Sequence, residues 1–204
     1  MANKICIIDY GSGNQKSLYN LIDYLGYNVC LSRREQDISD STHLLLPGVG
    51  SYVDLMERIN YLNLNDLINE HVLIKKKPFL GICVGMQVLS TFGNENNRIK
   101  GLDFIEGEVR KINSRGLKIP HIGWNNINLK KNSFSGSEIF FNLDFYFLHS
   151  YVFEPKDKNN IIGFTEYGET FPSIINKENI WGFQFHPEKS QQAGQIILKK
   201  FFQF

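Results

Sequence analysis

The sequence predicts an α/β fold, with a mainly parallel central sheet flanked by helices and with additional antiparallel strands. Up to about Asn94, short apolar runs alternate with longer amphipathic stretches, which is the pattern of a parallel sheet covered on both faces. Beyond Asn94 the apolar runs are short and lie between Gly, Pro and Asn turns, which indicates mixed or antiparallel strands. The chain has 204 residues, 42% of them hydrophobic, and shows no internal repeat and no linker, so we expect a single domain over residues 1–204.

The elements of the first half follow from the spacing of apolar residues and from the breaks between them. Leu and Ile recur at helical spacing from Leu18 to Leu25, and Gly26 suits the end of that helix. Pro47-Gly48-Val49-Gly50 interrupts the chain before helical segments over residues 52–74, and another helix passes through Met86 and Leu89. Four apolar runs are predicted as strands: Lys4–Ile8, Asn28–Ser32, 43–46 and 79–82.

In the second half the short β-rich runs predict further strands, and one amphipathic run predicts a closing helix. Apolar residues from Ile196 to Phe202 carry the helical pattern. The strands are expected over residues 107–112, 126–129, 145–148, 161–165 and 181–185.

Charge and cysteine content exclude several functions. Lys and Arg number 22 against 21 Asp and Glu, so no broad field is available to hold a polyanion or an anionic membrane, and we expect neither nucleic acid nor membrane as a partner. No apolar run approaches the roughly 18 to 20 residues of a membrane span, and the amino terminus lacks the apolar segment of a signal peptide, so we expect a cytoplasmic protein. The cysteines and histidines show no ligand or disulfide spacing, so we expect no metal and no cofactor.

The strongest local signal is Gly81-Ile82-Cys83-Val84-Gly85, at the junction of an apolar strand and a helix. It is the thiol counterpart of the G-x-S-x-G nucleophile elbow, whose glycines relieve crowding in a sharp turn. At a helix start, free backbone N–H groups favour a thiolate, and the amide of Val84 would face a developing oxyanion. From this pentapeptide alone, a buried structural cysteine is the alternative, which is the role we expect for Cys6 and Cys30.

A thiol nucleophile needs a base and a group that orients the base, and His186-Pro187-Glu188 supplies both. Pro187 favours extended geometry at His186, so the side chains at i and i+2 project to the same side. Glu188 could then accept a hydrogen bond from one ring nitrogen of His186, so that the other ring nitrogen faces Cys83. Alone, the tripeptide could equally be a surface turn.

Two glycine-rich loops follow strands. Pro47-Gly48-Val49-Gly50 ends the third strand, so its amides could complete an oxyanion hole, or it could be a plain strand-to-helix turn. The loop from Gly11 to Gly13 has Lys at position 16 where a dinucleotide fingerprint requires Gly, so we reject nucleotide binding.

Six segments in one order carry a family resemblance: 9–14, 46–50, 80–87, 120–125, 149–151 and 184–190. Together they resemble the class I (triad) glutamine amidotransferases, and among these the glutaminase subunit of imidazole glycerol phosphate synthase or a close paralogue from a surface-polysaccharide locus. The resemblance covers nearly the whole chain. Val84 stands where family members usually have Leu, and residues 94–97 and 190–194 are similar to those of the paralogues.

The resemblance implies a flavodoxin-like fold and the hydrolysis of L-glutamine to L-glutamate and ammonia through a thioester on Cys83. His186 and Glu188 would complete the catalytic triad. The oxyanion site implied by the resemblance uses backbone groups around Val49, Gly50 and Val84. The implied glutamine pocket includes Gln87, Glu95, Ser150 and Tyr151.

The resemblance also implies a partner. The glutaminase motifs run from Asp9 to Ser190, which leaves no room for a synthase domain, so we expect a 1:1 heterodimer with a subunit that receives the ammonia. The leading partner is the cyclase of histidine biosynthesis, which makes imidazole glycerol phosphate and AICAR; the alternative is a synthase that aminates a nucleotide-linked sugar. The implied docking face includes Asn14, Trp124, Tyr146 and Lys189, which could otherwise be two core aromatics and ordinary surface polar groups.

Two other function classes are weighed against this interpretation. A cysteine peptidase could share the thiol elbow, but Gln87 and the segment His149-Ser150-Tyr151 resemble a glutamine pocket. A partner-binding protein without catalysis would be expected to lack a triad member, and this sequence lacks none.

Overall fold

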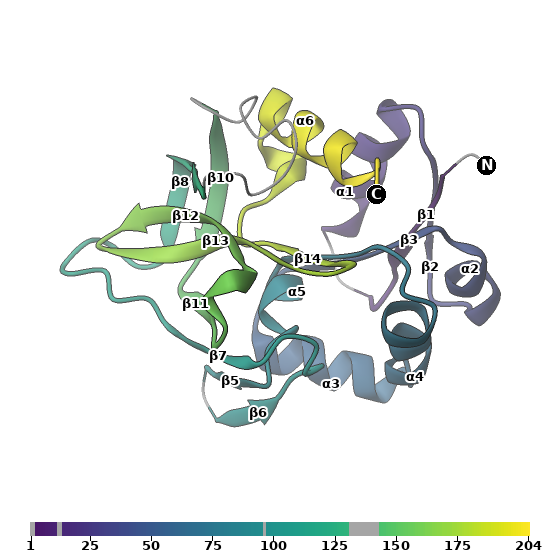
Figure 1. Cartoon of the computed structure of the whole chain (residues 1–204), viewed down its shortest axis with the longest axis horizontal. Coiled ribbons are helices and arrows are strands. Elements are labelled where there is room, and N and C mark those ends of the chain that lie inside the picture. The colour runs from purple at the N-terminus through teal and green to yellow at the C-terminus, as the bar shows by residue number, and fades with distance from the viewer. Residues whose placement is uncertain (1–2, 12–13, 96, 131–142) are drawn as a thin grey trace.

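A computed structural model gives the fold, and it describes residues 3–11, 14–95, 97–130 and 143–204. An eight-stranded sheet crosses the molecule in the order β2-β1-β3-β4-β14-β13-β12-β9 (Figure 1). The first five strands are parallel: β2(Asn28–Ser32), β1(Lys4–Ile8), β3(His43–Gly48), β4(Phe79–Cys83) and β14(Ile180–Phe183). The remaining three continue antiparallel: β13(Glu169–Lys177), β12(Ile161–Tyr167) and β9(Asn128–Leu129). In such doubly wound sheets, ligands bind beyond the carboxyl ends of the parallel strands.

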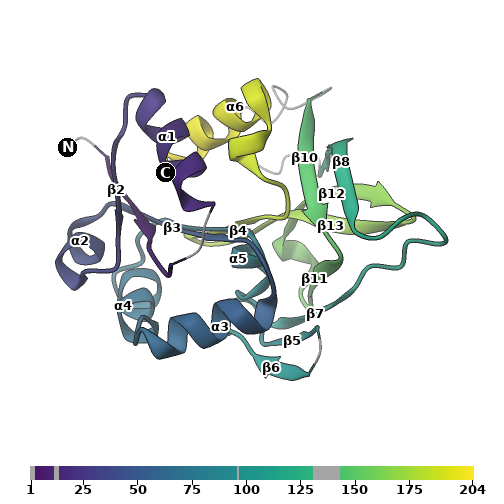
Figure 2. The same ribbon diagram turned by 180° about the vertical axis from the view of Figure 1, so that it is seen from behind.

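Helices cover both faces of the parallel part, as the two opposite views show (Figures 1 and 2). One face carries α1(Gln15–Tyr24) and α6(Gln191–Phe201), which bury stripes that include Leu18 and Ile197. The other face carries α3(Tyr52–Tyr61), α4(Asn65–Asn69) and the π-helical turn η1(Glu70–Ile74), with α2(Glu35–Asp40) near the β2 edge and α5(Val84–Gln87) directly after β4. None of the helices in the described ranges is long and apolar enough to cross a membrane.

Two smaller sheets lie beyond β13 and β12. A two-stranded antiparallel sheet consists of β8(His121–Asn126) and β10(Asp144–His149). A four-stranded sheet has the order β11(Tyr151–Pro155), β7(Gly107–Lys111), β5(Phe92–Asn94), β6(Arg98–Lys100). Two 3-10 turns complete the elements: η3(Lys158–Asn160) and η4(Pro187–Lys189).

The predicted mainly parallel sheet with flanking helices and added antiparallel strands is confirmed. Strands Lys4–Ile8 and Asn28–Ser32 are confirmed at both ends, and the strands predicted over 43–46 and 79–82 extend to Gly48 and Cys83. The helical stretch 52–74 is divided into three, with Asn63 at a φ of 53° between the first two. The single-domain assignment stays a prediction.

Other boundaries were wrong for identifiable reasons. The strand predicted over 181–185 ends at Phe183. The Gln184 amide still donates to the Ser173 carbonyl oxygen of β13 at 3.0 Å, but the His186 amide donates to the Tyr146 carbonyl oxygen of β10 at 2.9 Å, so the chain passes from the main sheet to β10. The run 126–129 belongs to two strands in different sheets, since β8 ends at Asn126 and β9 pairs with β12. Several elements were missed altogether: α2, β5, β6, β8, β11 and β13.

Candidate active site

The candidate site lies at the carboxyl ends of three neighbouring parallel strands. Gly48, the last residue of β3, pairs with Cys83, the last residue of β4, and β14 ends alongside at Phe183. The parallel register therefore places the Val49-Gly50 loop, Cys83 and the segment leading to His186 at one edge of the sheet.

Cys83 sits in the sharp turn that its glycine neighbours predict. Its backbone has φ 56° and ψ −111°, a conformation that non-glycine residues rarely adopt. A Cβ atom at Gly85 would collide with the Leu46 carbonyl oxygen, and one at Gly81 would collide with the Gly85 carbonyl oxygen. Gly81 is therefore required for β4 and α5 to meet this closely, and Gly85 is required for α5 to pack against β3, with Cys83 at the start of the helix.

His186 connects Cys83 to Glu188, as the H-P-E spacing predicts. Its Nδ1 lies 2.8 Å from Glu188 Oε1, and the two side chains are only 2% and 4% exposed. Burial lowers the pKa of His186, but the charge of Cys83 and hydrogen bonds to Cys83 and Glu188 outweigh burial and raise the pKa to about 10. The site therefore provides a thiol and a base in the wall of one cavity, close enough for the thiol to raise the pKa of the base, and a carboxylate hydrogen-bonded to the base. This is the set that nucleophilic catalysis on an acyl group requires.

The surroundings of the Cys83 thiol include one residue that the sequence reasoning missed. The thiol donates to the Leu148 carbonyl oxygen at 3.6 Å and accepts from Gln184 Nε2 at 3.8 Å. Gln184 is fully buried, and its Oε1 accepts from Gln87 Nε2 at 3.1 Å. Gln184 stood inside a recognised segment, but nothing in its spacing indicated a contact with the thiol.

A cavity of about 210 Å³ opens beside Cys83. The residues predicted for the oxyanion site and the glutamine pocket all line it, together with Cys83 and His186: Val49, Gly50, Val84, Gln87, Glu95, Ser150 and Tyr151. His149, which belongs to the segment that resembles a glutamine pocket, also lines the cavity, and Pro120 and Leu148, which were not predicted as site residues, complete the lining. A larger hollow of about 670 Å³ shares Val49 with this cavity but contains neither the thiol nor the base, so the smaller cavity is where chemistry at Cys83 can occur.

Three of the predicted pocket residues hold one another in place. Gln87 Nε2 donates to the Tyr151 carbonyl oxygen at 2.8 Å, and the Tyr151 hydroxyl donates to the Glu95 carbonyl oxygen at 3.1 Å. The Glu95 carboxylate accepts from the Tyr52 amide at 2.6 Å, at the start of α3. This part of the cavity wall is thus tied to α3, α5 and β11.

From the cavity wall, a series of hydrogen bonds runs through two buried histidines, His149 and His121. His149 Nδ1 donates to the Tyr151 carbonyl oxygen at 2.9 Å, so its Nε2 is left to accept from His121 Nδ1 at 3.1 Å. His121 Nε2 then accepts from Asn125 Nδ2 at 3.3 Å. Burial lowers the pKa of His149 to about 3 and that of His121 to about 4, so both are neutral near pH 7. These hydrogen bonds fix the Tyr151 backbone without adding charge to the cavity.

The four residues predicted for the docking face fall into two groups. Trp124 and Tyr146 pair across β8 and β10 with ring centroids 5.9 Å apart, and Lys189 Nζ lies 5.5 Å from the Tyr146 ring centroid. Trp124 is 48% exposed, so the alternative of a core aromatic is wrong for this residue. Asn14 instead donates from Nδ2 to Glu188 Oε1 at 2.9 Å and so reaches the back of the candidate triad.

Comparison with known proteins decides the family. The family model described as "Glutamine amidotransferase class-I" matches residues 6–203. The chain belongs to this family. It is 42% identical over 198 residues to the imidazole glycerol phosphate synthase subunit HisH 2 of Methanococcus maripaludis, covering 97% of this chain and 98% of the relative. It is 38% identical over 205 residues to subunit HisH of Leptospira interrogans, with the same coverage of both chains.

Solved structures agree at the level of the fold. This class I amidotransferase superimposes on a structure titled "Crystal structure of glutamine amidotransferase" with a TM-score of 0.77, at 15% identity and covering 98% and 97% of the two chains. It superimposes on "Structure of PurLQS from Thermotoga maritima" with a TM-score of 0.76, at 18% identity and covering 100% and 99%. These likenesses support the α/β architecture and, at such identity, nothing finer.

Proposed function

We propose that this chain is the glutaminase subunit of an imidazole glycerol phosphate synthase. It hydrolyses L-glutamine to L-glutamate and ammonia, and it passes the ammonia to a cyclase subunit in histidine biosynthesis. The single observation that carries the chemistry is the buried contact chain from Cys83 through His186 to Glu188 at the wall of the cavity. The names of the relatives that match over nearly the full length support the pathway.

In the first half of the reaction, the thiolate of Cys83 attacks the side-chain amide carbon of glutamine. The oxygen that becomes negative accepts hydrogen bonds from the Val84 amide at the start of α5 and from backbone groups around Val49 and Gly50. These three residues line the cavity. The raised pKa of His186 keeps a proton on its ring, and that proton goes to the leaving nitrogen, which departs as ammonia. A thioester on Cys83 remains.

In the second half, water attacks the thioester. His186, now neutral, takes a proton from the water, and the collapse of the second oxyanion releases glutamate and restores the Cys83 thiolate beside a protonated His186. Glu188 accepts from His186 Nδ1 throughout, which holds the ring with its other nitrogen toward the thiol and stabilises the imidazolium. Gln87, Glu95, Ser150 and Tyr151 hold the glutamine in the cavity.

The partner completes the proposal. Ammonia released into neutral water is protonated and loses its nucleophilicity, so a cyclase subunit in a 1:1 heterodimer covers the site and receives it directly. The exposed Trp124 beside Tyr146 and Lys189 supports a docking face on β8, β10 and η4. We place the complex in the cytoplasm, as the sequence predicts. The sugar-aminating alternative is not favoured, because the matching relatives carry the name of the histidine-pathway synthase.

The test combines the purified chain with the cyclase subunit and its acceptor ligand. We expect glutamine-dependent formation of imidazole glycerol phosphate together with stoichiometric glutamate, and no turnover of a nucleotide-linked sugar. Cys83→Ala should lose both products, while Cys30→Ala, which removes a thiol far from the cavity, should keep them. Product from the sugar, or glutamine turnover that survives Cys83→Ala, would contradict the proposal.

A further inference from the structure

The two cysteines without a role in glutamine chemistry, Cys6 and Cys30, lie side by side in the sheet. Cys6 of β1 is the direct parallel partner of Cys30 of β2. Neighbouring strands are about 4.8 Å apart, which falls within the range of about 4.4 to 6.8 Å that a disulfide requires between its Cα atoms. Cys6 Sγ also contacts the strand that carries Cys30, since it lies 3.9 Å from the Ser32 carbonyl oxygen of β2, and each thiol shifts the pKa of the other.

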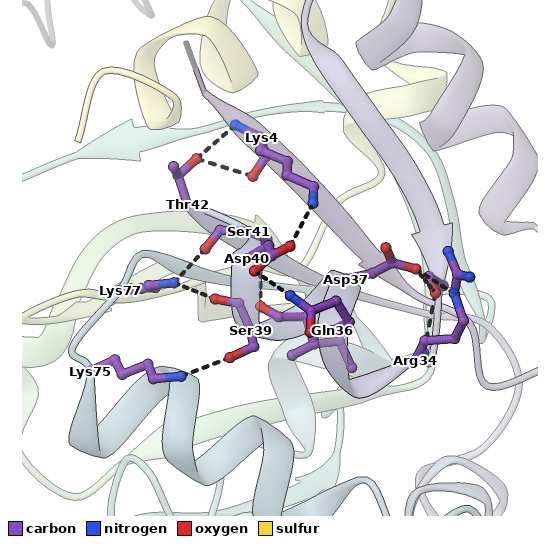
Figure 3. A network of polar contacts seen from close by, with 12 residues as sticks. Lys4, Arg34, Gln36, Asp37, Ser39, Asp40, Ser41, Thr42, Lys75 and Lys77 are labelled. Carbon is purple, nitrogen blue, oxygen red and sulfur yellow. Dashed lines mark hydrogen bonds and ion pairs between the residues drawn. The ribbon is translucent and has the colours of Figure 1, made fainter. Parts of the chain in front are cut away.

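Both thiols project to the face of the sheet under α2. Lys4, two residues before Cys6 on β1, reaches Asp40 of α2 with Nζ 3.4 Å from Oδ2 (Figure 3). Ser32, two residues after Cys30 on β2, donates to Asp37 of α2 at 2.6 Å. Because residues two apart on a strand share a face, Cys6 and Cys30 lie on the α2 side together.

The pair is asymmetric in exposure and in charge. Cys6 is fully buried, whereas Cys30 is only partly buried because β2 is the edge strand and α2 is a short cover whose one buried residue is Ile38. The hydrogen bond from Cys6 lowers the pKa of Cys30 to about 7, with Lys4 and Arg34 acting in the same direction and burial and Asp37 opposing. The same hydrogen bond and burial raise the pKa of Cys6. Cys30 is thus the accessible nucleophile, and Cys6 is the buried thiol that can react with Cys30 in a second step.

We propose that Cys6 and Cys30 form a thiol–disulfide exchange site, at which a low-molecular-weight disulfide such as oxidised glutathione converts the pair into a disulfide between β1 and β2. The site is separate from Cys83, which is the last residue of β4 and pairs with the last residue of β3. It belongs to the edge of the sheet, where the strand pairing already places the two cysteines directly opposite each other.

The exchange balances in two steps. The Cys30 thiolate attacks one sulfur of oxidised glutathione, which forms a mixed disulfide on Cys30 and releases one glutathione thiolate. Cys6 then loses its proton and attacks Cys30 Sγ, which forms the Cys6–Cys30 bond and releases the second glutathione thiolate. The two protein thiols are oxidised by two electrons, glutathione disulfide is reduced by the same two, and the two released thiolates take up the two protons.

The test uses the full chain carrying Cys83→Ser, so that Cys6 and Cys30 are the thiols that remain. After incubation of the folded protein with oxidised glutathione and acid quenching, we expect the intact mass to fall by two hydrogen atoms and digestion to give a peptide in which Cys6 is linked to Cys30. Dithiothreitol should reverse the change. Peptide mapping of the unsubstituted chain, which needs no variant to fold, should give the same linked peptide.

Two variants, checked for native circular dichroism, separate the steps. With Cys6→Ala added, the glutathione should stay on Cys30 as a lasting adduct, because the second thiol is gone. With Cys30→Ala added, neither adduct nor disulfide should form, because Cys6 is buried. A lasting glutathione adduct on the chain that keeps both thiols, or a folded chain that stays fully reduced, would overturn the proposal.

Discussion

Replacing Glu188 with glutamine removes one negative charge and keeps a side-chain oxygen that can accept from His186. Glu188 Oε1 lies 2.8 Å from His186 Nδ1, and both side chains are nearly fully buried. Unit charges about 4 Å apart interact by about 4 kcal/mol at an effective dielectric constant of about 20. The dipole of the glutamine amide would retain about half of this interaction energy, so the imidazolium would lose about 2 kcal/mol of stabilisation. This loss should lower kcat for glutamine hydrolysis about thirtyfold. His186→Ala should be far more damaging, because it removes the base itself.

The same substitution should move the pH profile. Burial acts to lower the pKa of His186, and the charge of Cys83 and the contacts with Cys83 and Glu188 raise it to about 10. A raised pKa keeps the ring protonated up to that value, so wild-type kcat/KM should hold through neutral pH and decline as the pH rises through about 10. Without the Glu188 charge the pKa falls, and this alkaline limb should shift to lower pH.

The assay is steady-state glutamate release across the alkaline range, with the cyclase subunit and its acceptor ligand present. Glu35→Gln, at an exposed position on α2, is the matched control and should leave both kcat and the profile unchanged. Wild-type kcat with an unshifted alkaline limb in Glu188→Gln would refute the reasoning and make Glu188 a structural turn residue.

Three further predictions concern the nucleophile, the histidine chain and the partner. Cys83→Ala should abolish glutamine hydrolysis, and a glutamine-analogue alkylator should label Cys83 alone; labelling of Cys6 or Cys30 would count against the assignment. His121→Ala leaves the Nε2 of His149 without its donor and should raise KM for glutamine about tenfold with a smaller effect on kcat, whereas His43→Ala, remote from the cavity, should leave KM unchanged. Glutamate release should be low for the isolated chain and rise when the partner holds its acceptor ligand; equal full rates in both samples would exclude this coupling.

The triad could be predicted from sequence because each of its parts is local. The glycines around Cys83 are needed for one sharp turn, and the spacing from His186 to Glu188 is set by one extended residue and a proline. In contrast, Gln184 reaches Cys83 only because β14 pairs with β4, and His121 meets His149 only because β8 pairs with β10. Contacts of this kind depend on strand pairing between segments far apart in the sequence, which no spacing within a segment reveals.

The missed elements have equally specific causes. α2 is six residues long and buries only Ile38, so it has no apolar stripe that a periodicity could detect. β5 and β6 have three residues each and are half exposed, which gives too few positions for an alternating pattern. β13 contains Pro172, which counts against a strand in sequence reasoning, although the residues from Phe171 to Ile175 are all buried against neighbouring strands.

One residue of the predicted docking face, Asn14, contacts the triad directly, and this bears on how a partner could govern the rate. Glu188 Oε1 accepts both from His186 Nδ1 and from Asn14 Nδ2, and Asn14 stands at the N-cap of α1. The residue after Glu188 is Lys189, whose ammonium lies over the Tyr146 ring. The carboxylate that orients the base is therefore hydrogen-bonded to one residue of the predicted docking face, Asn14, and precedes another, Lys189, in the chain. A subunit that displaced Asn14 would be expected to change the Glu188–His186 contact, because Asn14 Nδ2 and His186 Nδ1 donate to the same carboxylate oxygen.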